Sequence, residues 1–377
     1  MNVFAIKIVA FFTALLTFLF SIPSMSVRKN VDNVILFVGD GMGEMHIEMT
    51  KEMRNTDLII DTLPQQGYAM TYSASSSVTD SAAGGTALAT GTKTENGRIA
   101  TYWPKMEGYA EYEGYYPLSI TELCMKNGLK TGVITTDNLT GATPGAFTAH
   151  AESREDKEDI ALDQLASGID IIWGKDDSTV TSSQVNAAGY TYIKTIEGMN
   201  SLTGNEKSYG LFTESMYHVT NKNSYTPTLS QMTARAIELL DSTSENGFFL
   251  MVEGAHIDKR SHDQDEAAAA EALEEFDNAI ELALEFAEAD GRTLIVVTAD
   301  HETGGVIIND NGEYEMTTGS HTSRNVPVRA YGPYSFVADG EIINNIEVSV
   351  RIAAALGFEK GSIPAKKEIP ADNFNVD

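Results

Sequence analysis

The clearest pattern in this chain is an alternation of short apolar runs with longer segments of mixed polarity. Each apolar run has the length and composition of a β-strand that is buried on both faces. Predicted strands cover residues 34–38, 131–136, 169–173, 248–252 and 294–298. Predicted helices cover residues 81–89, 118–127, 155–167, 228–240 and 265–290. Strands that alternate with helices indicate an α/β fold, in which a large, mostly parallel sheet is flanked by helices on both faces.

Two segments break this pattern. Residues 102–116 are rich in Tyr, Glu and Gly, and residues 175–226 consist of short polar pieces separated by glycines. We expect both to be surface insertions, and the composition of the first does not choose between a lid, an interface patch and a simple loop. No repeat or linker divides the remainder, so residues 27–377 are predicted to form one large domain.

The first residues have the features of an export signal. Lys7 supplies a positive charge, residues 8–20 are apolar apart from two threonines, and Ser24-Met25-Ser26 offers small residues for cleavage before Val27. Residues 1–26 are therefore predicted to be the signal peptide of a periplasmic or secreted protein that has no membrane contact after cleavage. An uncleaved N-terminal anchor is the alternative.

Charge and cysteine content argue against several classes of function. The chain has 377 residues and a formal net charge of −28, so it repels nucleic acid and we expect no nucleic-acid partner. Cys124 is the only cysteine, and it lies in an apolar helical pattern where we expect it to be buried. Neither a catalytic cysteine nor a zinc–thiolate site is expected.

Three predicted strands lead into acidic residues, namely Asp40, Glu253 and Asp300. The carboxyl ends of parallel strands meet at one edge of a sheet, where α/β proteins bind ligands. Converging carboxylates repel one another, and burying them without a counter-charge is costly. Multivalent cations would remove that cost.

Histidines near these carboxylates indicate which cations would bind. Asp258 and His262 are four residues apart and would share one face of a helix, and His301 directly follows the last of the three acidic residues. His321 precedes the apolar segment 326–331. Mixed His and carboxylate ligands suit Zn²⁺, whereas sites made only of oxygen ligands suit Mg²⁺. Taken singly, each feature has a simpler explanation as a helix-surface pair, a structural hydrogen-bonded pair or a loop residue.

Ser81 begins a run of small residues that suits a closely packed helix. Its hydroxyl would lie at or just inside the helix N-terminus, next to free backbone N–H groups and the positive end of the helix dipole. Such a place can hold a phosphate group and stabilise an alkoxide. The simpler alternative is that Ser81 only caps the helix.

Six short motifs, in their order and spacing, resemble those of the alkaline phosphatase family. They are Asp40-Gly41-Met42-Gly43, Thr79-Asp80-Ser81-Ala82, Ala142-Thr143-Pro144 with Arg154 downstream, Val252-Glu253-Gly254 followed by Ile257-Asp258-Lys259 and His262, Thr298-Ala299-Asp300-His301-Glu302-Thr303-Gly304-Gly305, and Thr318-Gly319-Ser320-His321-Thr322. The resemblance runs from about residue 31 to residue 333. It implies a catalytic domain that hydrolyses phosphate monoesters at alkaline pH, commonly as a homodimer.

The resemblance also implies a role for each matching residue. One Zn²⁺ would be held by Asp258, His262 and His321, a second Zn²⁺ by Asp40, Asp300 and His301 together with Ser81, and one Mg²⁺ by Asp40, Thr143 and Glu253. Ser81, activated by the metals, would be the nucleophile that forms a covalent phosphoserine. Arg154 would bind two phosphate oxygens, and Lys259 would contact the phosphate through water.

One position departs from the family pattern. Gly141 stands where members often carry Asp or His near the magnesium, so water or another residue must complete that metal's surroundings. His46, His150, His218 and His256 match no ligand position, and we expect them to be structural or on the surface.

Two other functions remain as alternatives to a phosphomonoesterase. A phosphodiesterase of the same superfamily commonly uses a Thr nucleophile, and Thr79 is nearby, although the spacing favours Ser81. A sulfatase is disfavoured, because Ser81 is not in the Cys/Ser-x-Pro-x-Arg context of that class. A non-enzymatic exported protein that binds metal or phosphate would explain the carboxylates, but not the presence of both Ser81 and Arg154 in matching places.

Overall fold

The computed structural model describes residues 31–102, 115–214, 216–358 and 366–368. The predicted signal peptide and most of the predicted 102–116 insertion lie outside these ranges. None of the described helices combines the length and the apolar composition needed to cross a membrane.

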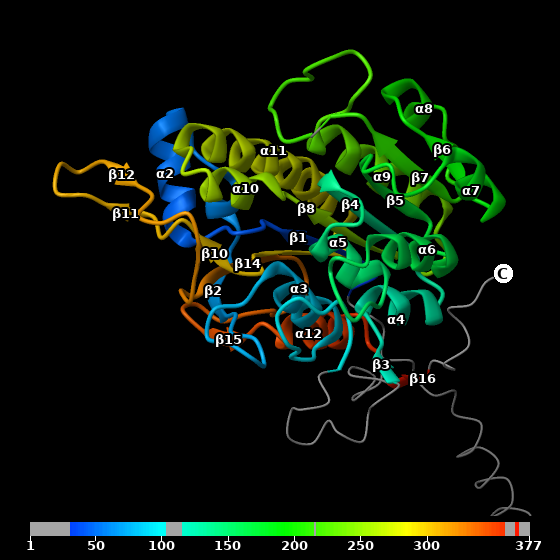
Figure 1. Ribbon diagram of the computed structural model, residues 1–377, viewed down its shortest axis with the longest axis horizontal. Coiled ribbons are helices and arrows are strands. Elements are labelled where there is room, and N and C mark those ends of the chain that lie inside the picture. Colours follow the sequence, from blue (N-terminus) through cyan, green and yellow to red (C-terminus); the bar gives the residue numbers. More distant parts are fainter. Residues whose placement is uncertain (1–30, 103–114, 215, 359–365, 369–377) are drawn as a thin grey trace, which may run out of the picture.

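A ten-stranded sheet runs through the centre of the molecule (Figure 1), with the strand order β15-β2-β14-β9-β1-β8-β4-β5-β7-β6. Its strands are β1 (Asn33–Val38), β2 (Gln65–Met70), β4 (Lys130–Asn138), β5 (Ile171–Lys175), β6 (Thr191–Ile193), β7 (Ser208–Phe212), β8 (Phe248–Glu253), β9 (Thr293–Thr298), β14 (Val326–Tyr331) and β15 (Ile342–Asn344). Neighbouring strands are parallel except where β14 runs antiparallel to β2 and β9. The prediction of a large, mostly parallel sheet is confirmed.

Helices cover both faces of this sheet. Figure 1 shows α2, α9 and α11 on one face and α3, α4 and α12 on the other. The described helices are α2 (Glu44–Arg54), the 3₁₀-helix η1 (Ile59–Thr62), α3 (Ser81–Thr90), α4 (Ile120–Lys126), α5 (Ala142–Thr148), α6 (Lys157–Ser167), α7 (Ser182–Ala187), α8 (Ile196–Asn200), α9 (Leu229–Thr243), α10 (His256–His262), α11 (Glu266–Asp290) and α12 (Glu347–Ala355). Short two-stranded ribbons are formed by β10 (Glu302–Thr303) with β13 (His321–Thr322), β11 (Ile307–Ile308) with β12 (Tyr314–Glu315), and β3 (Tyr115–Pro117) with β16 (Lys366–Glu368).

The central strands are part of the hydrophobic core. Every residue of β1, β8 and β9 is buried, as expected for parallel strands that carry apolar side chains on both faces. Phe37 of β1 packs edge to face on Phe276 of α11, with ring centroids 5.7 Å apart. The apolar runs seen in the sequence are therefore the strands of the core, and Cys124 of α4 is buried beside them as predicted.

Residues 175–226 contribute more to the sheet than their polar sequence indicates. β6 and β7 form one edge of the sheet, and all residues of β7 are buried. Trp173 of β5 donates a hydrogen bond from its indole Nε1 to Ser208 (3.0 Å), and a Cβ on Gly210 would stand 2.8 Å from the Trp173 ring. Small and polar residues are thus needed in β7 to accommodate the tryptophan, and for that reason β7 does not show as an apolar run.

The turn after β1 depends on a glycine. Gly41 has φ +74°, and a Cβ there would stand 2.8 Å from the Cα of Asp258 on α10. Gly41 therefore permits both a left-handed backbone conformation and the close approach of two segments that are distant in the sequence. The positions of Asp40 and Asp258 relative to each other follow from this contact.

We expect Gly41→Ala to destabilise the protein by at least about 2 kcal/mol, because the new side chain would be strained in φ and would also collide with α10. Gly189→Ala is the matched control, since Gly189 also has positive φ (+86°) but nothing lies within 4 Å of its added Cβ. That variant should lose roughly 1 kcal/mol from backbone strain alone. Urea unfolding of both variants measures the difference, and equal losses would contradict the close-approach argument.

Candidate active site

Three carboxylates come together at the carboxyl ends of β1, β8 and β9. Val38, the last residue of β1, is in register with Glu253 of β8 and with Thr298 of β9. Asp40 and Asp300 each follow their strand by two residues, so these carboxylates and Glu253 meet at one edge of the sheet. All three residues are buried, with exposed fractions of at most 7%. The structure thus brings together the strand-end carboxylates predicted from the sequence.

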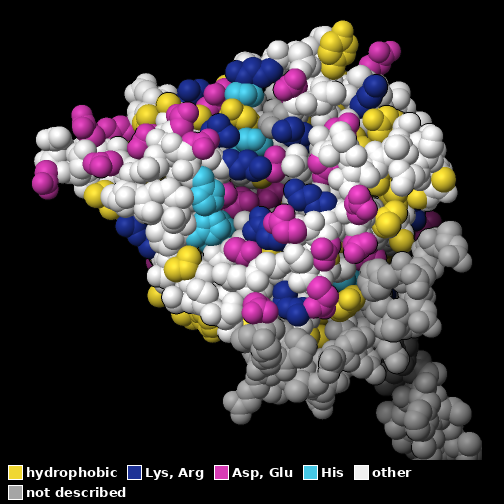
Figure 2. Space-filling view, in the orientation of Figure 1, with side chains coloured by type: hydrophobic (Ala, Val, Ile, Leu, Met, Phe, Trp, Pro, Cys, Tyr) yellow, Lys and Arg dark blue, Asp and Glu magenta, His cyan; other side chains and the backbone are white. Residues whose placement is uncertain are grey.

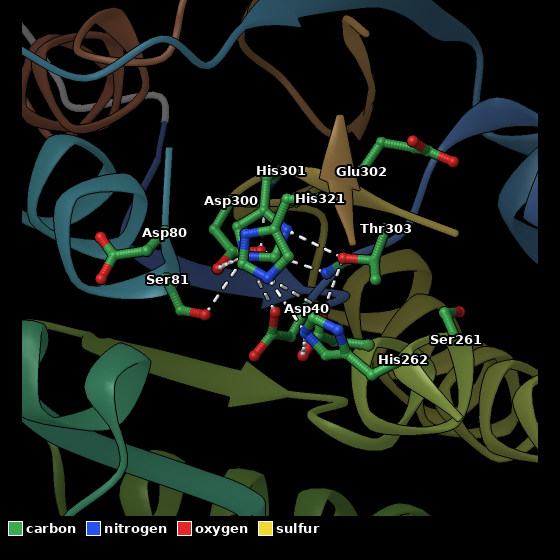
Figure 3. A network of polar contacts seen from close by, with 12 residues as sticks. Asp40, Asp80, Ser81, Ser261, His262, Asp300, His301, Glu302, Thr303 and His321 are labelled. Atoms are coloured by element: carbon green, nitrogen blue, oxygen red, sulfur yellow. Dashed lines mark hydrogen bonds and ion pairs between the residues drawn. The ribbon is translucent and has the colours of Figure 1, made fainter. Parts of the chain in front are cut away.

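Asp258, His262 and His321 form one group of ligand-type side chains. Figure 3 shows His262 and His321 side by side in this group. Asp258 and His262 lie one turn apart on α10, with His262 Nε2 3.3 Å from Asp258 Oδ2. His321 of β13 places its Nε2 3.1 Å from His262 Nε2 and 3.6 Å from Asp258 Oδ1. This is the ligand set expected for the first Zn²⁺.

Backbone carbonyls orient both histidines. Nδ1 of His262 lies 2.8 Å from the carbonyl oxygen of Gly319, and Nδ1 of His321 lies 2.9 Å from that of Thr79. A carbonyl can only accept, so each Nδ1 carries a proton, and each Nε2 is directed toward the cluster. Such a second hydrogen bond is the usual way in which a metal-binding histidine is held in place.

A second group surrounds His301. Its Nε2 lies 3.2 Å from Ser81 Oγ, 3.2 Å from Asp300 Oδ2 and 3.5 Å from Asp40 Oδ1. The ligand atoms of Asp40, Asp258 and His301 all lie within 4.8 Å of one another. Asp258 therefore stands between the two groups, whereas the sequence assigned it only to the first. Asp300 also binds the backbone N–H groups of Gly41 and His301 through Oδ1 (3.2 and 3.0 Å).

Burial and mutual repulsion disfavour the charged forms of these carboxylates. Burial, followed by the charges of Asp300 and Asp258, raises the pKa of Asp40 well above its usual value. Burial likewise raises the pKa of Glu253 to about 8 and, together with the charge of Asp258, that of Asp300 to about 6. Asp258 is the exception. Burial opposes its ionisation, but the hydrogen bond from His262 and the charges of His301 and His262 lower its pKa overall.

Burial and neighbouring charges also shift the pKa values of the histidines. The partner Asp258 raises the pKa of His262 to about 9, whereas burial lowers the pKa of His301 to about 4. Burial and the nearby His301 also lower the pKa of His321. Burial thus favours the neutral imidazoles of His301 and His321, next to Asp40 and Asp300, whose ionisation is disfavoured. This is the arrangement expected of a site that is completed by cations.

Three buried oxygen atoms support this interpretation. Asp40 Oδ1, Asp300 Oδ2 and Thr143 Oγ1 form no hydrogen bond of ordinary geometry within the described residues. Buried polar atoms normally have such a bond, so these atoms are available to a ligand that accepts oxygen donors. The donor set therefore fits divalent cations.

Ser81 is the first residue of α3, and Asp80 is the N-cap. The Asp80 carboxylate accepts hydrogen bonds from the backbone N–H groups of Ala83 and Gly97 (3.0 and 2.9 Å). The cap considered for Ser81 is thus provided by Asp80, which leaves the Ser81 hydroxyl free to face His301. The prediction that Ser81 lies just inside a helix N-terminus is correct.

Arg154 reaches the same helix end. Its Nη1 donates to Asp80 Oδ2 (3.1 Å), and its guanidinium is about a third exposed. Asp80 therefore orients both the nucleophile-bearing helix and the arginine. Figure 2 shows histidine side chains at the surface beside a recess with acidic side chains, ringed by Lys and Arg, so the cluster opens to solvent on this face.

Glu253, Thr143 and Lys259 lie on the other side of Asp40. Glu253 is 2% exposed and accepts a short hydrogen bond from Thr135 Oγ1 of β4. Thr143 of α5 is buried next to it, and its hydroxyl favours the ionised form of Glu253. Lys259 Nζ forms an ion pair with Asp137 (2.5 Å). Glu253 and Thr143 are two of the residues expected around the Mg²⁺, whereas Lys259 was expected to contact the phosphate through water.

Sequence reasoning missed three residues that support the site. Thr303 donates to Asp258 Oδ1 (2.5 Å) and lies 3.2 Å from His301 Nδ1, so it holds both groups in place. Asp80 orients Arg154, and Asp137 binds Lys259. Thr303 and Asp80 stand inside recognised motifs and could have been singled out there, whereas nothing local marks Asp137.

The other histidines have structural contacts. His46 lies 3.1 Å from Ser261 Oγ and accepts from the backbone N–H of Gly43, and His150 contacts Glu122 and the carbonyl of Ala100. His218 pairs with Glu271, and His256 with Thr136. None of them belongs to the two described groups of ligand-type side chains.

The family model described as "Alkaline phosphatase" matches residues 31–173 and 174–316. The chain belongs to the alkaline phosphatase family. The second matched part includes residues 175–226, for which the motifs showed little resemblance. The fold is thus that of a family of phosphomonoester hydrolases.

Individual members of the alkaline phosphatase family are similar over most of the chain. Alkaline phosphatase 4 of Bacillus subtilis is 35% identical over 309 residues, which cover 76% of this chain and 64% of that relative. The alkaline phosphatase of Escherichia coli is 30% identical, with 88% and 87% covered. The solved alkaline phosphatase from the Antarctic bacterium TAB5 superposes with a TM-score of 0.77 at 31% identity and covers 87% of this chain and 99% of that one. A variant of the TAB5 enzyme, with a TM-score of 0.75, has Mg bound in a site called M3.

Glu253 should make the stability of the metal-free protein depend on pH. Its pKa is about 8 in the folded protein and 4.5 in a model peptide, so between these values the folded state holds a proton that the unfolded chain has lost. The contribution of Glu253 to stability therefore falls as pH rises through this interval and levels off above pH 8. From pH 6.5 to 8 we expect the free energy of unfolding to fall by about 2 kcal/mol, with His262 acting in the same direction.

Thermal unfolding of the chelator-treated protein at a series of pH values measures this dependence. Glu253→Gln, which cannot ionise, should flatten most of the slope. A transition temperature that is constant or rises from pH 6.5 to 8 would show that Glu253 is ionised in the metal-free fold.

Proposed function

We propose that this protein hydrolyses phosphate monoesters through a covalent phosphoserine on Ser81, and releases inorganic phosphate and an alcohol. The observation that carries the proposal is the place of Ser81. Its hydroxyl lies at the N-terminus of α3 and 3.2 Å from His301, at the edge of a buried cluster of carboxylates and histidines. Family membership supports the reaction class, and the length of the match to the Escherichia coli enzyme supports its extension to the whole described chain.

The metals implied by the family are two Zn²⁺ and one Mg²⁺. Asp258, His262 and His321 would hold one Zn²⁺, Asp40, Asp300 and His301 with Ser81 the other, and Asp40, Thr143 and Glu253 the Mg²⁺. Asp258 is close enough to both zinc groups to serve either. When bound, such metals lower the pKa of the serine hydroxyl and stabilise the charge of the leaving oxygen. The Mg bound in the TAB5 variant supports the presence of a third site.

The side chains of this protein take different parts in the two half-reactions. In the first half-reaction, Ser81 Oγ forms a bond to phosphorus while the bond from phosphorus to the ester oxygen breaks and the alcohol leaves. In the second, water attacks phosphorus, the Ser81–phosphate bond breaks, and the serine regains its proton. Arg154 binds two non-bridging oxygens, and Lys259 lies beside the site as a further positive charge. The positive end of the α3 dipole favours the dianionic phosphate.

The remaining proposals concern the signal peptide, the domain organisation, the location and the assembly of the protein. We propose residues 1–26 as a signal peptide, residues 27–377 as one catalytic domain, a periplasmic or secreted location and a homodimeric assembly. Small phosphomonoesters would be the substrates. A phosphodiesterase and a non-enzymatic metal-binding protein are the competing functions.

We expect Ser81→Ala to lower kcat for a chromogenic phosphomonoester by at least about a thousandfold, because it removes the atom that accepts the phosphoryl group. Ser182→Ala is the matched control, since Ser182 is also the first residue of a helix but lies on α7, away from the cluster. It should keep full activity. Removal of metal by chelation should abolish activity, and Zn²⁺ with Mg²⁺ should restore it.

Several results would reject this function. Full activity after exhaustive metal removal would exclude the three-metal site, and full activity of the Ser81 variant would exclude the phosphoserine. Preference for a phosphodiester substrate would assign the protein to the phosphodiesterases. Hydrolysis of neither substrate by the metal-loaded protein would leave only a binding role.

Arg154→Lys should weaken the inhibition constant of inorganic phosphate by about tenfold or more, because lysine keeps the charge but loses the planar pair of donors. Arg235→Lys is a control on α9, away from the cluster, where the guanidinium binds the carbonyls of Asn200 and Leu202. That change should leave phosphate inhibition unaltered. An Arg154→Lys enzyme with unchanged inhibition would show that the guanidinium does not contact phosphate.

A further inference from the structure

We infer that Asp137 supplies the carboxylate that Gly141 lacks beside the third metal site, where it holds Lys259 and contributes negative charge to the Mg²⁺ pocket. Asp137 would be a positioning residue that acts through water and through Lys259, not a direct ligand. This inference rests on the metal site proposed above, and it concerns a residue that no motif singles out.

The backbone leaves no space for a side chain at position 141. Gly141 precedes α5, and its N–H donates to the carbonyl of Asn138 (2.8 Å) in a tight turn. A Cβ on Gly141 would stand 2.9 Å from that same carbonyl oxygen. A carboxylate near the metal must therefore come from another position in this chain.

The end of β4 carries such a carboxylate. The pairing of β4 with β5 shifts register between Ile134 and Asn138, which is the mark of a bulge or similar irregularity. Bulges re-aim side chains next to active sites. Asp137 lies inside this irregular stretch and is only 9% exposed. It therefore turns inward at the place where the strand meets the site.

Hydrogen bonds connect Asp137 to the pocket of Glu253. The backbone N–H of Asp137 donates to Thr135 Oγ1 (3.1 Å), and Thr135 Oγ1 donates to Glu253 Oε2. Thr143 completes this pocket, and its buried hydroxyl forms no hydrogen bond of ordinary geometry. Asp137 is thus connected through Thr135 to Glu253, which is one of the predicted oxygen ligands of the Mg²⁺.

The side chain of Asp137 reaches α10. Its Oδ2 lies 2.5 Å from Lys259 Nζ, and Lys259 is adjacent in sequence to Asp258. Asp137 therefore links the side chains around the Mg²⁺ to the helix that carries two ligands of the first Zn²⁺. Burial opposes ionisation of Asp137, but the charge and hydrogen bond of Lys259 lower its pKa overall, so it stays negative and adds to the charge felt by Glu253.

Because Asp137 and Lys259 have opposite charges, we expect their substitutions to have opposite effects on Mg²⁺ binding. Asp137→Asn removes negative charge near the metal and should weaken Mg²⁺ binding by about tenfold, the lower end of the range for groups that support metal ligands. Lys259→Gln removes a competing positive charge and should strengthen Mg²⁺ binding several-fold. If the substitutions instead disturbed the geometry of the whole metal site, Mg²⁺ binding would be weaker in both variants.

The test is a calorimetric titration of MgCl₂ into the full-length protein, loaded with Zn²⁺ and freed of Mg²⁺. Asp170→Asn is the matched control, because Asp170 forms a similar ion pair with Lys130 (2.9 Å) at the opposite end of β4. It should leave the Kd for Mg²⁺ unchanged. The Zn²⁺ content of each variant, measured by elemental analysis, should also stay unchanged.

Either of two results would overturn the inference. One is a Kd for Mg²⁺ in Asp137→Asn that matches the parent protein or the Asp170→Asn control, and the other is weaker binding in both Asp137→Asn and Lys259→Gln. The readout does not require turnover, so it is separate from the proposed function. Failure of Ser81→Ala to reduce hydrolysis would reject the phosphoserine and leave this measurement interpretable.

Discussion

Electrostatic repulsion among buried carboxylates is the constraint on which the rest of this site depends. The parallel register of β1, β8 and β9 brings Asp40, Glu253 and Asp300 to one edge of the sheet, and α10 adds Asp258. Without cations, burial and repulsion hold the pKa values of the first three above their usual range. The same arrangement that weakens the metal-free fold is one that multivalent cations would stabilise. Histidines with one nitrogen bound to a backbone carbonyl then direct the other toward those cations.

Ser81 is placed by a helix that can approach this cluster closely. All residues of α3 are buried and most are small, and a Cβ on Gly84 would stand 2.9 Å from the carbonyl oxygen of Asp300. Close packing of α3 on the loop after β9 brings Ser81 next to His301. Asp80 then caps the helix with one carboxylate and orients Arg154 with the same group. Arg154 and the helix that carries Ser81 are thus held by a single side chain.

The end of β4 places an acidic residue close to Gly141, which itself has no side chain. Gly141 lies in the turn in front of α5, where an added Cβ would stand 2.9 Å from the carbonyl oxygen of Asn138. The irregular pairing of β4 and β5 turns a different acidic residue, Asp137, toward Lys259. The proposed role of Asp137 depends on this turn of the backbone, which directs its side chain inward.

The sequence by itself determined the strands of the core, the parallel sheet, the strand-end carboxylates and the helical pair Asp258 and His262. These features are encoded by local periodicity and by the shared direction of parallel strands. Only the tertiary structure decided that β6 and β7 join the sheet, that Asp258 stands between both groups of ligands, and that Asp80 and Asp137 bind Arg154 and Lys259. Asp80 and Arg154, for example, are 74 residues apart. Contacts of this kind depend on how helices pack and where a strand bulges, and no local pattern of apolar and polar residues specifies either.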